Sequence, residues 1–330
     1  MKITIAIIAS LIAAKAHASE FFFEQDKTLP LVHISVAFNG GSTQDPDGKN
    51  GATNLMSKLI MRGTKQKTKQ QIDMTLDQLG ADLDTEVRGE YTVLRGSVLS
   101  ENLPGFLSLL EEVIASPSFR ADEFEKLRKE QISTLLENLD NDQQLIRTKF
   151  DQLIFKNHPY SKLNQGRIRD VQSLKIADIQ KQYEKIFNES RMLILISGNA
   201  SASDFDSFRG HLDHKLKRNT RLDTIPAFDG FPRKAKLVIV DKPDRTQTQG
   251  SIVQKGTTFN DQALDALQIA NFAFGGGTFL SKLMVELRVK RGWTYGAGSA
   301  FKFASQPHSW RVSFFPRMPI LRRPSRNPSA

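Results

Sequence analysis

The sequence predicts an α+β fold in two blocks of unequal length, and three observations lead to this class. Stretches that alternate apolar and polar residues, as half-buried strands do, are interspersed with stretches whose apolar residues recur every three or four positions, as in amphipathic helices. The chain has 330 residues, of which 39% are hydrophobic and 25% charged, enough apolar material for two ordinary domains. The polar stretch 218–233, which contains Pro226, Gly230 and Pro232, predicts a linker between the blocks.

The first block begins with a strand and is dominated by helices. Residues 31–39 alternate well enough for a strand, and the glycine- and aspartate-rich turns that follow predict a loop before the first helix. Strands are predicted at 31–39, 81–88, 91–99 and 192–197. Helices are predicted at 50–61, 69–80, 103–115, 121 to about 155, 176–187 and 202–216. Long helices beside several antiparallel strands indicate a helical layer packed on a sheet.

The second block repeats the order of strands followed by helices, without a clear sequence repeat. Its predicted strands are 236–240, 250–254, 295–303 and 310–314. Its predicted helices are 261–274 and 278–290, separated by a turn at 275–277, where three glycines stand together.

The first eighteen residues predict a secretory signal peptide. Lys2 supplies the basic start, residues 3–14 form a short apolar run, and Ala16-His17-Ala18 provides a small-residue cleavage site. A buried N-terminal helix is the alternative. No later stretch reaches the apolar length that a membrane span requires. The sequence has no cysteine, so neither disulfides nor thiolate zinc sites are expected.

The formal net charge of +10 is concentrated near the two ends of the chain. Lys2 and Lys15 lie in the predicted signal peptide, and four arginines lie after Phe315, where no acidic residue occurs. The +4 that remains for the folded body is ordinary for a solvated surface. We therefore expect no nucleic-acid partner.

The stretch from Gly51 to Thr64 has the frame of a zinc-peptidase helix without its metal ligands. It reads Gly-Ala-Thr-Asn-Leu-Met-Ser-Lys-Leu-Ile-Met-Arg-Gly-Thr and resembles a stretch of the pitrilysin/insulinase family, which includes the mitochondrial processing peptidases. In that family two histidines bind zinc and a glutamate between them is the general base. Those positions hold Asn54, Ser57 and Lys58 here. An amide is a poor ligand, a hydroxyl is no base near neutral pH, and an ammonium repels a cation. We expect no metal or other cofactor in this chain, and no peptide hydrolysis by it alone.

The family's third zinc ligand is a glutamate in the long helix that follows. Glu130 and Glu137 lie in that neighbourhood, but an ungapped alignment falls on neither. His211 and His214 form the one close histidine pair of the sequence, without a suitable third ligand nearby. We expect none of these residues to hold a metal.

A second resemblance lies in residues 280–295. Relatives read roughly Ser-x-Leu-x-x-x-Leu-Arg-x-Lys-x-Gly-x-x-Tyr, and Arg288 and Tyr295 fall on the arginine and the tyrosine. In active relatives this pair reaches the substrate carbonyl at the zinc site of the other half of the enzyme. A guanidinium and a phenol are suitable donors to the oxyanion of the transition state. On spacing alone they could also be a solvated helix residue and a half-buried strand residue.

Two weaker resemblances agree with this order. His158-Pro159-Tyr160, followed by Gly166, is similar to a His-Pro-Tyr-Gly region of the family, and we expect His158 to be a packing or hydrogen-bonding residue. Residues 80–85 resemble the edge strand on which relatives hold a substrate peptide by strand addition. The resemblance implies that Asp84, Thr85 and Gly276 contact substrate.

The resemblance runs from about Phe21 to Phe314 and implies tandem peptidase-like domains. Each would be an antiparallel-rich sheet packed with helices, a half clamshell. The expected parts are a signal peptide at 1–18, an N-terminal domain at 19–217, the linker at 218–233, a partial C-terminal domain at 234–315 and a disordered tail at 316–330. Relatives continue past the position of Phe314, whereas a proline-rich stretch without periodicity follows here. We therefore expect an incomplete second domain, from a truncated or frame-shifted product or with a genuine short tail.

Taken with the resemblance, these features predict the non-catalytic subunit of an exported split zinc peptidase, in the bacterial periplasm. Its partner in a heterodimer would be a sister chain that holds the zinc and degrades peptides, with Arg288 and Tyr295 acting in that chain's site. The alternative is a non-enzymatic scaffold, assembly or peptide-binding protein of the same fold. The least favoured hypothesis is that the chain is a zinc enzyme by itself.

Overall fold

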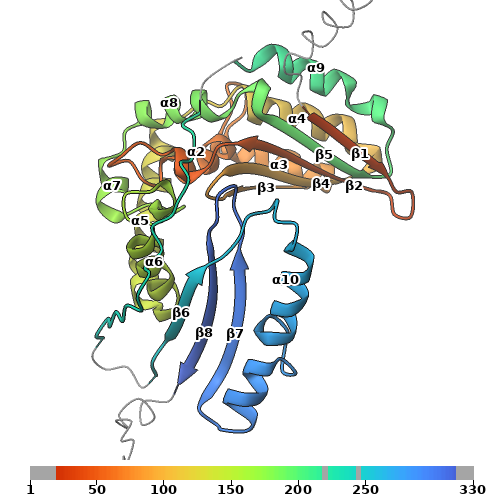
Figure 1. Ribbon diagram of the computed structural model, residues 1–330. Helices are drawn as coiled ribbons and strands as arrows, with labels where there is room; N and C mark the ends of the chain where they lie inside the picture. Colours follow the sequence, from red (N-terminus) through yellow and green to blue (C-terminus); the bar gives the residue numbers. More distant parts are fainter. Residues whose placement is uncertain (1–19, 218–221, 243–246, 317–330) are drawn as a thin grey trace, which may run out of the picture. The chain divides into compact units, whose positions relative to one another are not determined.

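The computed structural model describes residues 20–217, 222–242 and 247–316 and confirms the α+β class (Figure 1). The chain forms two compact units. Among the described residues, the first unit comprises 20–136 and 162–223, and the second comprises 137–161 and 224–316. The predicted signal peptide lies outside the described residues, as does the predicted tail except for Pro316. The predicted domain boundaries remain a prediction.

The first unit contains a five-stranded sheet in the order β1-β5-β2-β4-β3. The strands are β1 (Glu20–Gln25), β2 (Leu31–Asn39), β3 (Asp82–Val87), β4 (Tyr91–Leu99) and β5 (Met192–Gly198). β1 runs parallel to β5, and the other neighbours are antiparallel. The strands predicted from alternation are confirmed, whereas β1 was not predicted.

Helices cover one face of this sheet. They are α2 (Ala52–Leu59), α3 (Lys69–Leu79), α4 (Leu103–Ala115), α5 (Ala121–Asp140), α7 (Ile168–Ser173), α8 (Ile176–Ile186) and α9 (Asp206–Lys215). Alternate residues of β2, from Val32 to Phe38, are buried in one core with residues of these helices, and His33 on the opposite face is exposed. The alternation therefore fixes which face of each strand the helices cover.

The predicted long helix over 121–155 is wrong, because the chain breaks at Asn141 into α5 and α6 (Asp142–Ile154). Asn141 adopts extended backbone angles, with φ −86° and ψ 104°. Its side chain accepts a hydrogen bond from the backbone N–H of Gln144 at 3.1 Å. An asparagine that caps a new helix in this way satisfies an otherwise unpaired amide, which is why two helices replace one.

The second unit contains α6 and a three-stranded antiparallel sheet in the order β6-β8-β7. The strands are β6 (Gly250–Lys255), β7 (Thr294–Lys302) and β8 (Ser309–Pro316). Between β6 and β7 lie α10 (Leu264–Asn271) and the π-helical segments η7 (Phe272–Gly276) and η8 (Met284–Val289). The predicted helices are thus confirmed in place but are shorter and partly π-helical.

The strand predicted at 236–240 is wrong, since this segment has no strand or helix. Leu237 and Ile239 are 85% and 79% exposed. An apolar alternating segment becomes a strand only when a neighbouring strand satisfies its backbone groups, and none of the described strands pairs with it. The described part of the predicted linker, 222–233, also lacks helix and strand.

Close contacts hold the helical layer of the second unit on its sheet. Asn271 donates through Nδ2 to the carbonyl of Ser299 at 3.2 Å and accepts through Oδ1 from Trp310 Nε1 at 2.8 Å. A Cβ on the buried Gly275 would meet Ser299 of β7, its hydroxyl at 2.6 Å and its backbone nitrogen at 2.8 Å, so only glycine permits this approach of helix and sheet. No helix in the described parts of the chain is long and apolar enough to cross a membrane.

Candidate functional site

Helix α2 begins with a turn that an aspartate from the preceding loop holds in place. Gly51 adopts φ 97°, a left-handed conformation that favours glycine. The carboxylate of Asp45 accepts hydrogen bonds from the N–H of Gly51 at 2.7 Å and from the N–H of Thr53 at 2.9 Å. The hydroxyl of Thr53 donates to the same carboxylate at 2.6 Å. Asp45 thus satisfies the first amides of α2, which has no capping side chain of its own.

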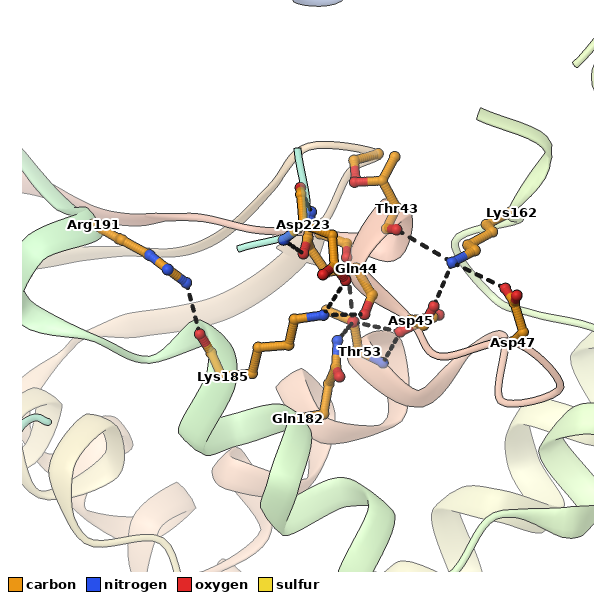
Figure 2. A network of polar contacts seen from close by, with 12 residues as sticks. Thr43, Gln44, Asp45, Asp47, Thr53, Lys162, Gln182, Lys185, Arg191 and Asp223 are labelled. Carbon is orange, nitrogen blue, oxygen red and sulfur yellow. Dashed lines mark hydrogen bonds and ion pairs between the residues drawn. The ribbon is translucent and has the colours of Figure 1, made fainter. Parts of the chain in front are cut away.

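Asp45 is itself buried, with 1% of its surface exposed. Burial raises the pKa of its carboxyl to about 6, against the hydrogen bonds from Thr53 and Gly51, which act to lower it. The ammonium of Lys162 lies close by, donating to the backbone carbonyl of Asp45 at 2.5 Å and pairing with Asp47 at 3.4 Å (Figure 2).

The same loop is tied to other parts of the first unit. Gln44 and Asp223 pair side chain to backbone, with Gln44 Nε2 donating to the carbonyl of Asp223 at 2.8 Å and the N–H of Asp223 donating to Gln44 Oε1 at 3.0 Å. Lys185 of α8 donates to the carboxylate of Asp223 at 2.7 Å. Gln182, one turn earlier, donates to the hydroxyl of Thr53 at 2.8 Å (Figure 2). The network fixes the start of α2 against α8.

The positions that correspond to metal ligands on α2 are occupied by groups that bond to one another or to the backbone. Asn54 Nδ2 donates to Gln131 Oε1 on α5 at 2.8 Å, and both side chains are buried. Gln131 Nε2 donates to the carbonyls of Gly51 at 3.2 Å and Gln165 at 2.8 Å. Ser57 is buried and donates to the carbonyl of Asn54 at 3.0 Å, whereas Lys58 is exposed.

These residues do not fit a zinc ion. Zinc sites in proteins use deprotonated imidazole, thiolate or carboxylate groups that converge on the metal. Here two neutral amides satisfy each other, a hydroxyl donates to the backbone and the remaining group is an ammonium. Nothing in this set supplies anionic charge to the cation, and Lys58 adds a positive one.

Gln131 was missed by the sequence analysis, which considered Glu130 and Glu137 on this helix. Glu130 instead pairs with Arg62 at 3.1 Å, and Glu137 belongs to the second unit. The residue of α5 that bonds to Asn54 is Gln131, which follows Glu130, and its side chain is an amide. The one signal in the sequence that could have identified Gln131 is its position next to Glu130 on the same predicted helix.

The histidines considered in the sequence have other partners. His158 Nδ1 accepts from the N–H of Tyr160 at 3.2 Å, so its other nitrogen carries the proton and donates to the carbonyl of Pro226 at 3.0 Å. The prediction that it is a hydrogen-bonding residue is confirmed. His211 lies 2.9 Å from the carboxylate of Glu111. Among residues 20–217, 222–242 and 247–316, no group of three or more histidine, aspartate or glutamate side chains could hold a metal ion.

Asp84 and Thr85 lie on β3, an edge strand of the first unit's sheet. Asp84 is exposed and pairs in register with Arg95 of β4, and Thr85 is half-buried. A hollow of about 340 Å³ lies over this part of the sheet, lined by His33, Asp82, Leu83, Asp84, Arg95, Gly96 and Ser97. An edge strand beside an open hollow is a suitable place for an extended peptide.

Arg288, Tyr295 and Gly276 all lie in the second unit. Arg288 is exposed on η8, and its guanidinium carbon lies 4.9 Å from the centre of the Phe279 ring. Tyr295 is on β7 and is 52% exposed. Gly276 ends η7, where a Cβ would meet the amide of Asn271 at 2.6 Å. Both predicted donors, Arg288 and Tyr295, thus lie at the surface of the second unit, whereas α2 belongs to the first.

Two family models match most of the chain. The model described as Insulinase (Peptidase family M16) matches residues 21–163, and that described as Peptidase M16 inactive domain matches residues 173–316. A Helicobacter pylori protein named non-peptidase homolog YmxG is 24% identical over 299 residues, which are 87% of this chain and 66% of that protein. An uncharacterized zinc protease of Rickettsia felis is 25% identical, over 81% of this chain and 64% of its own length. This chain therefore spans about two thirds of these relatives.

Solved structures show the same fold. The crystal structure of a peptidase M16 inactive domain from Pseudomonas fluorescens superposes with a TM-score of 0.86 at 24% identity, covering 92% of this chain and 73% of that one. The crystal structure of a protease from Helicobacter pylori superposes with a TM-score of 0.82 at 19% identity, covering 92% and 73%.

Proposed function

This chain belongs to the insulinase family, peptidase family M16, and from that premise we propose that it is the non-catalytic subunit of a split zinc peptidase. In this proposal a sister chain holds the zinc and cleaves peptides, and this chain supplies Arg288 and Tyr295 to the sister's site. The observation that carries the proposal is the set of groups at the ligand positions of α2. Asn54 and Gln131 are amides bonded to each other, and Lys58 is an ammonium, so the ligand positions of α2 do not fit zinc.

The exposure of Arg288 and Tyr295 supports the second half of the proposal. A subunit that contributes to a partner's site must present the contributing groups on its surface, and both side chains are exposed. The guanidinium of arginine is a cation with several N–H donors, and the phenol of tyrosine has one O–H donor. Such donors stabilise the negative charge that develops on a substrate carbonyl when a peptide bond is attacked.

The names of the relatives are compatible with both kinds of subunit in this family. The Helicobacter pylori relative is named a non-peptidase homolog, and the Rickettsia felis relative a zinc protease. The proposed location is the periplasm of a bacterium, and it depends on the signal-like sequence of residues 1–18 alone.

The test is reconstitution with a sister chain that carries an intact His-x-x-Glu-His helix. The two chains are co-expressed and copurified, and hydrolysis of an unstructured peptide is measured with and without this chain. We expect hydrolysis only with both chains. Arg288→Ala in the reconstituted pair should lower kcat by about 100-fold or more, because one charged donor to the oxyanion is lost.

Arg291→Ala is the matched control, since Arg291 is the same residue type three positions away and is bound to Glu286 at 2.6 Å. It should leave kcat within about twofold. Unchanged hydrolysis in the pair with Arg288→Ala would contradict the proposed role of that residue.

A peptide-binding or scaffold protein of the same fold is the second candidate. The hollow beside the edge strand β3 favours it, because an extended peptide could bind there without any catalytic group. This candidate predicts that the chain binds peptide by itself and that Asp84→Lys changes the affinity. Peptide hydrolysis that appears only when this chain is added would exclude a purely scaffolding role.

A further inference from the structure

Three cationic residues lie at the end of the helical segment η8. Lys290 Nζ pairs with Glu286 Oε1 at 2.6 Å. Arg291 donates to Glu286 Oε2 at 2.6 Å and to the backbone carbonyl of Glu286 at 3.0 Å. Hydrogen bonds from Lys290 and Arg291 lower the pKa of the Glu286 carboxyl to about 2. One carboxylate therefore engages two of the three cations, and Arg288 is the third.

Arg288 has an aromatic ring as its partner where its two neighbours have a carboxylate. Its guanidinium carbon lies 4.9 Å from the centre of the Phe279 ring. In the part of the chain that the structure describes, this guanidinium makes no ion pair and no hydrogen bond. A carboxylate would occupy two of its N–H donors and neutralise its charge. The face of a ring attracts a cation within about 6 Å and leaves most of the N–H donors free.

Burial does not account for the position of Phe279. Its side chain is 62% exposed, and it contacts no second aromatic ring among residues 20–217, 222–242 and 247–316. A backbone turn fixes the residue instead, because the N–H of Ser281 donates to the carbonyl of Thr278 at 3.1 Å across it. Ser281 is buried and accepts from the N–H of Val285 at 3.0 Å, so this turn leads directly into the helix. The ring is thus presented beside the helix that carries Arg288.

The backbone of Arg288 is also fixed, since its carbonyl accepts from the N–H of Gly292 at 3.0 Å. Its long side chain is exposed and, without a partner, would occupy many rotamers. A donor that must meet an oxyanion acts best when it is in place before the charge develops. The Phe279 ring restricts the guanidinium at no cost in donors, which is what such a role requires.

We propose that Phe279 is a positioning residue for Arg288, whose guanidinium it holds in place with the N–H donors free for the substrate oxyanion in the sister chain's site. This inference rests on the role proposed above for Arg288 and adds the residue that orients it. Phe279 does not touch the substrate, so its effect on the reaction passes through Arg288. Loss of the ring lowers the fraction of molecules in which the guanidinium is ready for the transition state.

The test compares Phe279→Leu with Phe279→Tyr in the reconstituted pair. Because a cation–ring contact at an exposed site is weak, Phe279→Leu should lower kcat about three- to fivefold. KM should stay within about twofold, since the oxyanion forms only in the transition state. Phe279→Tyr keeps the ring and should keep kcat within about twofold. In a chain that carries Arg288→Ala, Phe279→Leu should have no further effect, because no guanidinium is left to hold.

Phe259→Leu is the matched control. Phe259 also lies in the second unit and is 56% exposed, but its ring neighbour is Phe303, at 5.7 Å between ring centres, and not a cation. The variant should leave kcat within about twofold. A loss as large as that of Phe279→Leu would overturn the proposal, since any exposed ring of this unit would then have the same effect.

A second readout needs no sister chain. In the arginine-labelled chain alone, the side-chain protons of Arg288, assigned with Arg288→Lys, should resonate upfield of their positions in Phe279→Leu, because the face of a ring shields protons above it. Identical positions in the two proteins would overturn the proposal. Hydrolysis by the pair that Phe279→Leu leaves undiminished would overturn this inference alone. No hydrolysis with the unaltered chain would overturn the proposed function, and the positioning role in that reaction with it.

Discussion

Gln131 makes hydrogen bonds that suit an amide and exclude a carboxylate. Its Nε2 donates to the carbonyls of Gly51 and Gln165, and its Oε1 accepts from Asn54. The side chain is 3% exposed, so water cannot replace a lost partner. Glutamate has no donor at neutral pH and would bring a buried charge against two carbonyl oxygens. Gln131 therefore fastens α5 to the start of α2 in the place where a metalloenzyme would need an anionic ligand.

Gln131→Glu should lower the free energy of unfolding by about 2–4 kcal/mol at pH 7, since the carbonyls of Gly51 and Gln165 lose the donor that Gln131 supplies and a charge is buried. The measurement is urea denaturation followed by far-UV circular dichroism. Glu130→Gln is the control on the neighbouring residue, whose side chain is 56% exposed and pairs with Arg62. It should cost less than about 1 kcal/mol. Equal stability of the two variants would contradict the structural role given to Gln131.

Asp45 should make the stability of the first unit depend on pH. Burial raises the pKa of its carboxyl from 3.8 to about 6 in the folded chain. Between about pH 4 and 6 the folded state therefore binds more protons than the unfolded state, and the free energy of unfolding falls as pH rises. This contribution is complete below pH 4 and is lost above pH 6.

Asp45→Asn removes this titration. The variant should lose less stability than the original chain between pH 4 and pH 7, by about 2 kcal/mol, the order expected for a shift of this size. Its free energy of unfolding should also be lower by about 1 kcal/mol at every pH, because an amide offers one acceptor oxygen to Gly51 and Thr53 where the carboxylate offers two. Urea denaturation at four pH values in this range measures both effects. Parallel stability curves for the two proteins would contradict the burial effect.

At the scale of helices and strands, periodicity predicted the elements whose partners lie in the same unit. β2, β4 and α4 have the predicted bounds, because alternation and a three-to-four repeat report which face is buried. The break at Asn141 was not predicted, because an asparagine within a helical pattern caps a new helix only when the backbone turns there. The segment 236–240 has the pattern of a strand but lacks a partner among the described strands. A sequence pattern reports which side chains could be buried, and pairing decides whether they are.

At the candidate site, too, the sequence predicted the chemistry of single residues but not the contacts between distant ones. Asn54, Ser57 and Lys58 could be identified as unsuitable ligands from their chemistry alone. The hydrogen bond from Asn54 to Gln131 joins residues far apart in the sequence, so no local pattern predicted it. Asp45 was predicted only as part of the turn before the first helix, because nothing in the sequence shows that its carboxylate bonds to the first turn of α2.

At the scale of the whole molecule, the two units differ in how well they are packed. The core of the first unit draws buried side chains from every strand of its sheet except β1 and β3, together with most of its helices. In the second unit the buried cluster consists of Phe155, Tyr160 and Ala304. Most of the large apolar side chains that are exposed in the described residues also belong to the second unit. Because buried apolar surface is the main stabilising term, the second unit should be the less stable of the two.

The chain allows this difference to be measured directly, because its two tryptophans, Trp293 and Trp310, both lie in the second unit. Trp310 donates to Asn271 at the contact between helix and sheet, so its fluorescence reports the packing of that unit. Most helices belong to the first unit, so far-UV circular dichroism reports mainly on that one. We expect the fluorescence transition in urea at a concentration about 1 M or more below the dichroism transition. Coincident transitions would contradict this expectation, because they would show that the two units unfold as one.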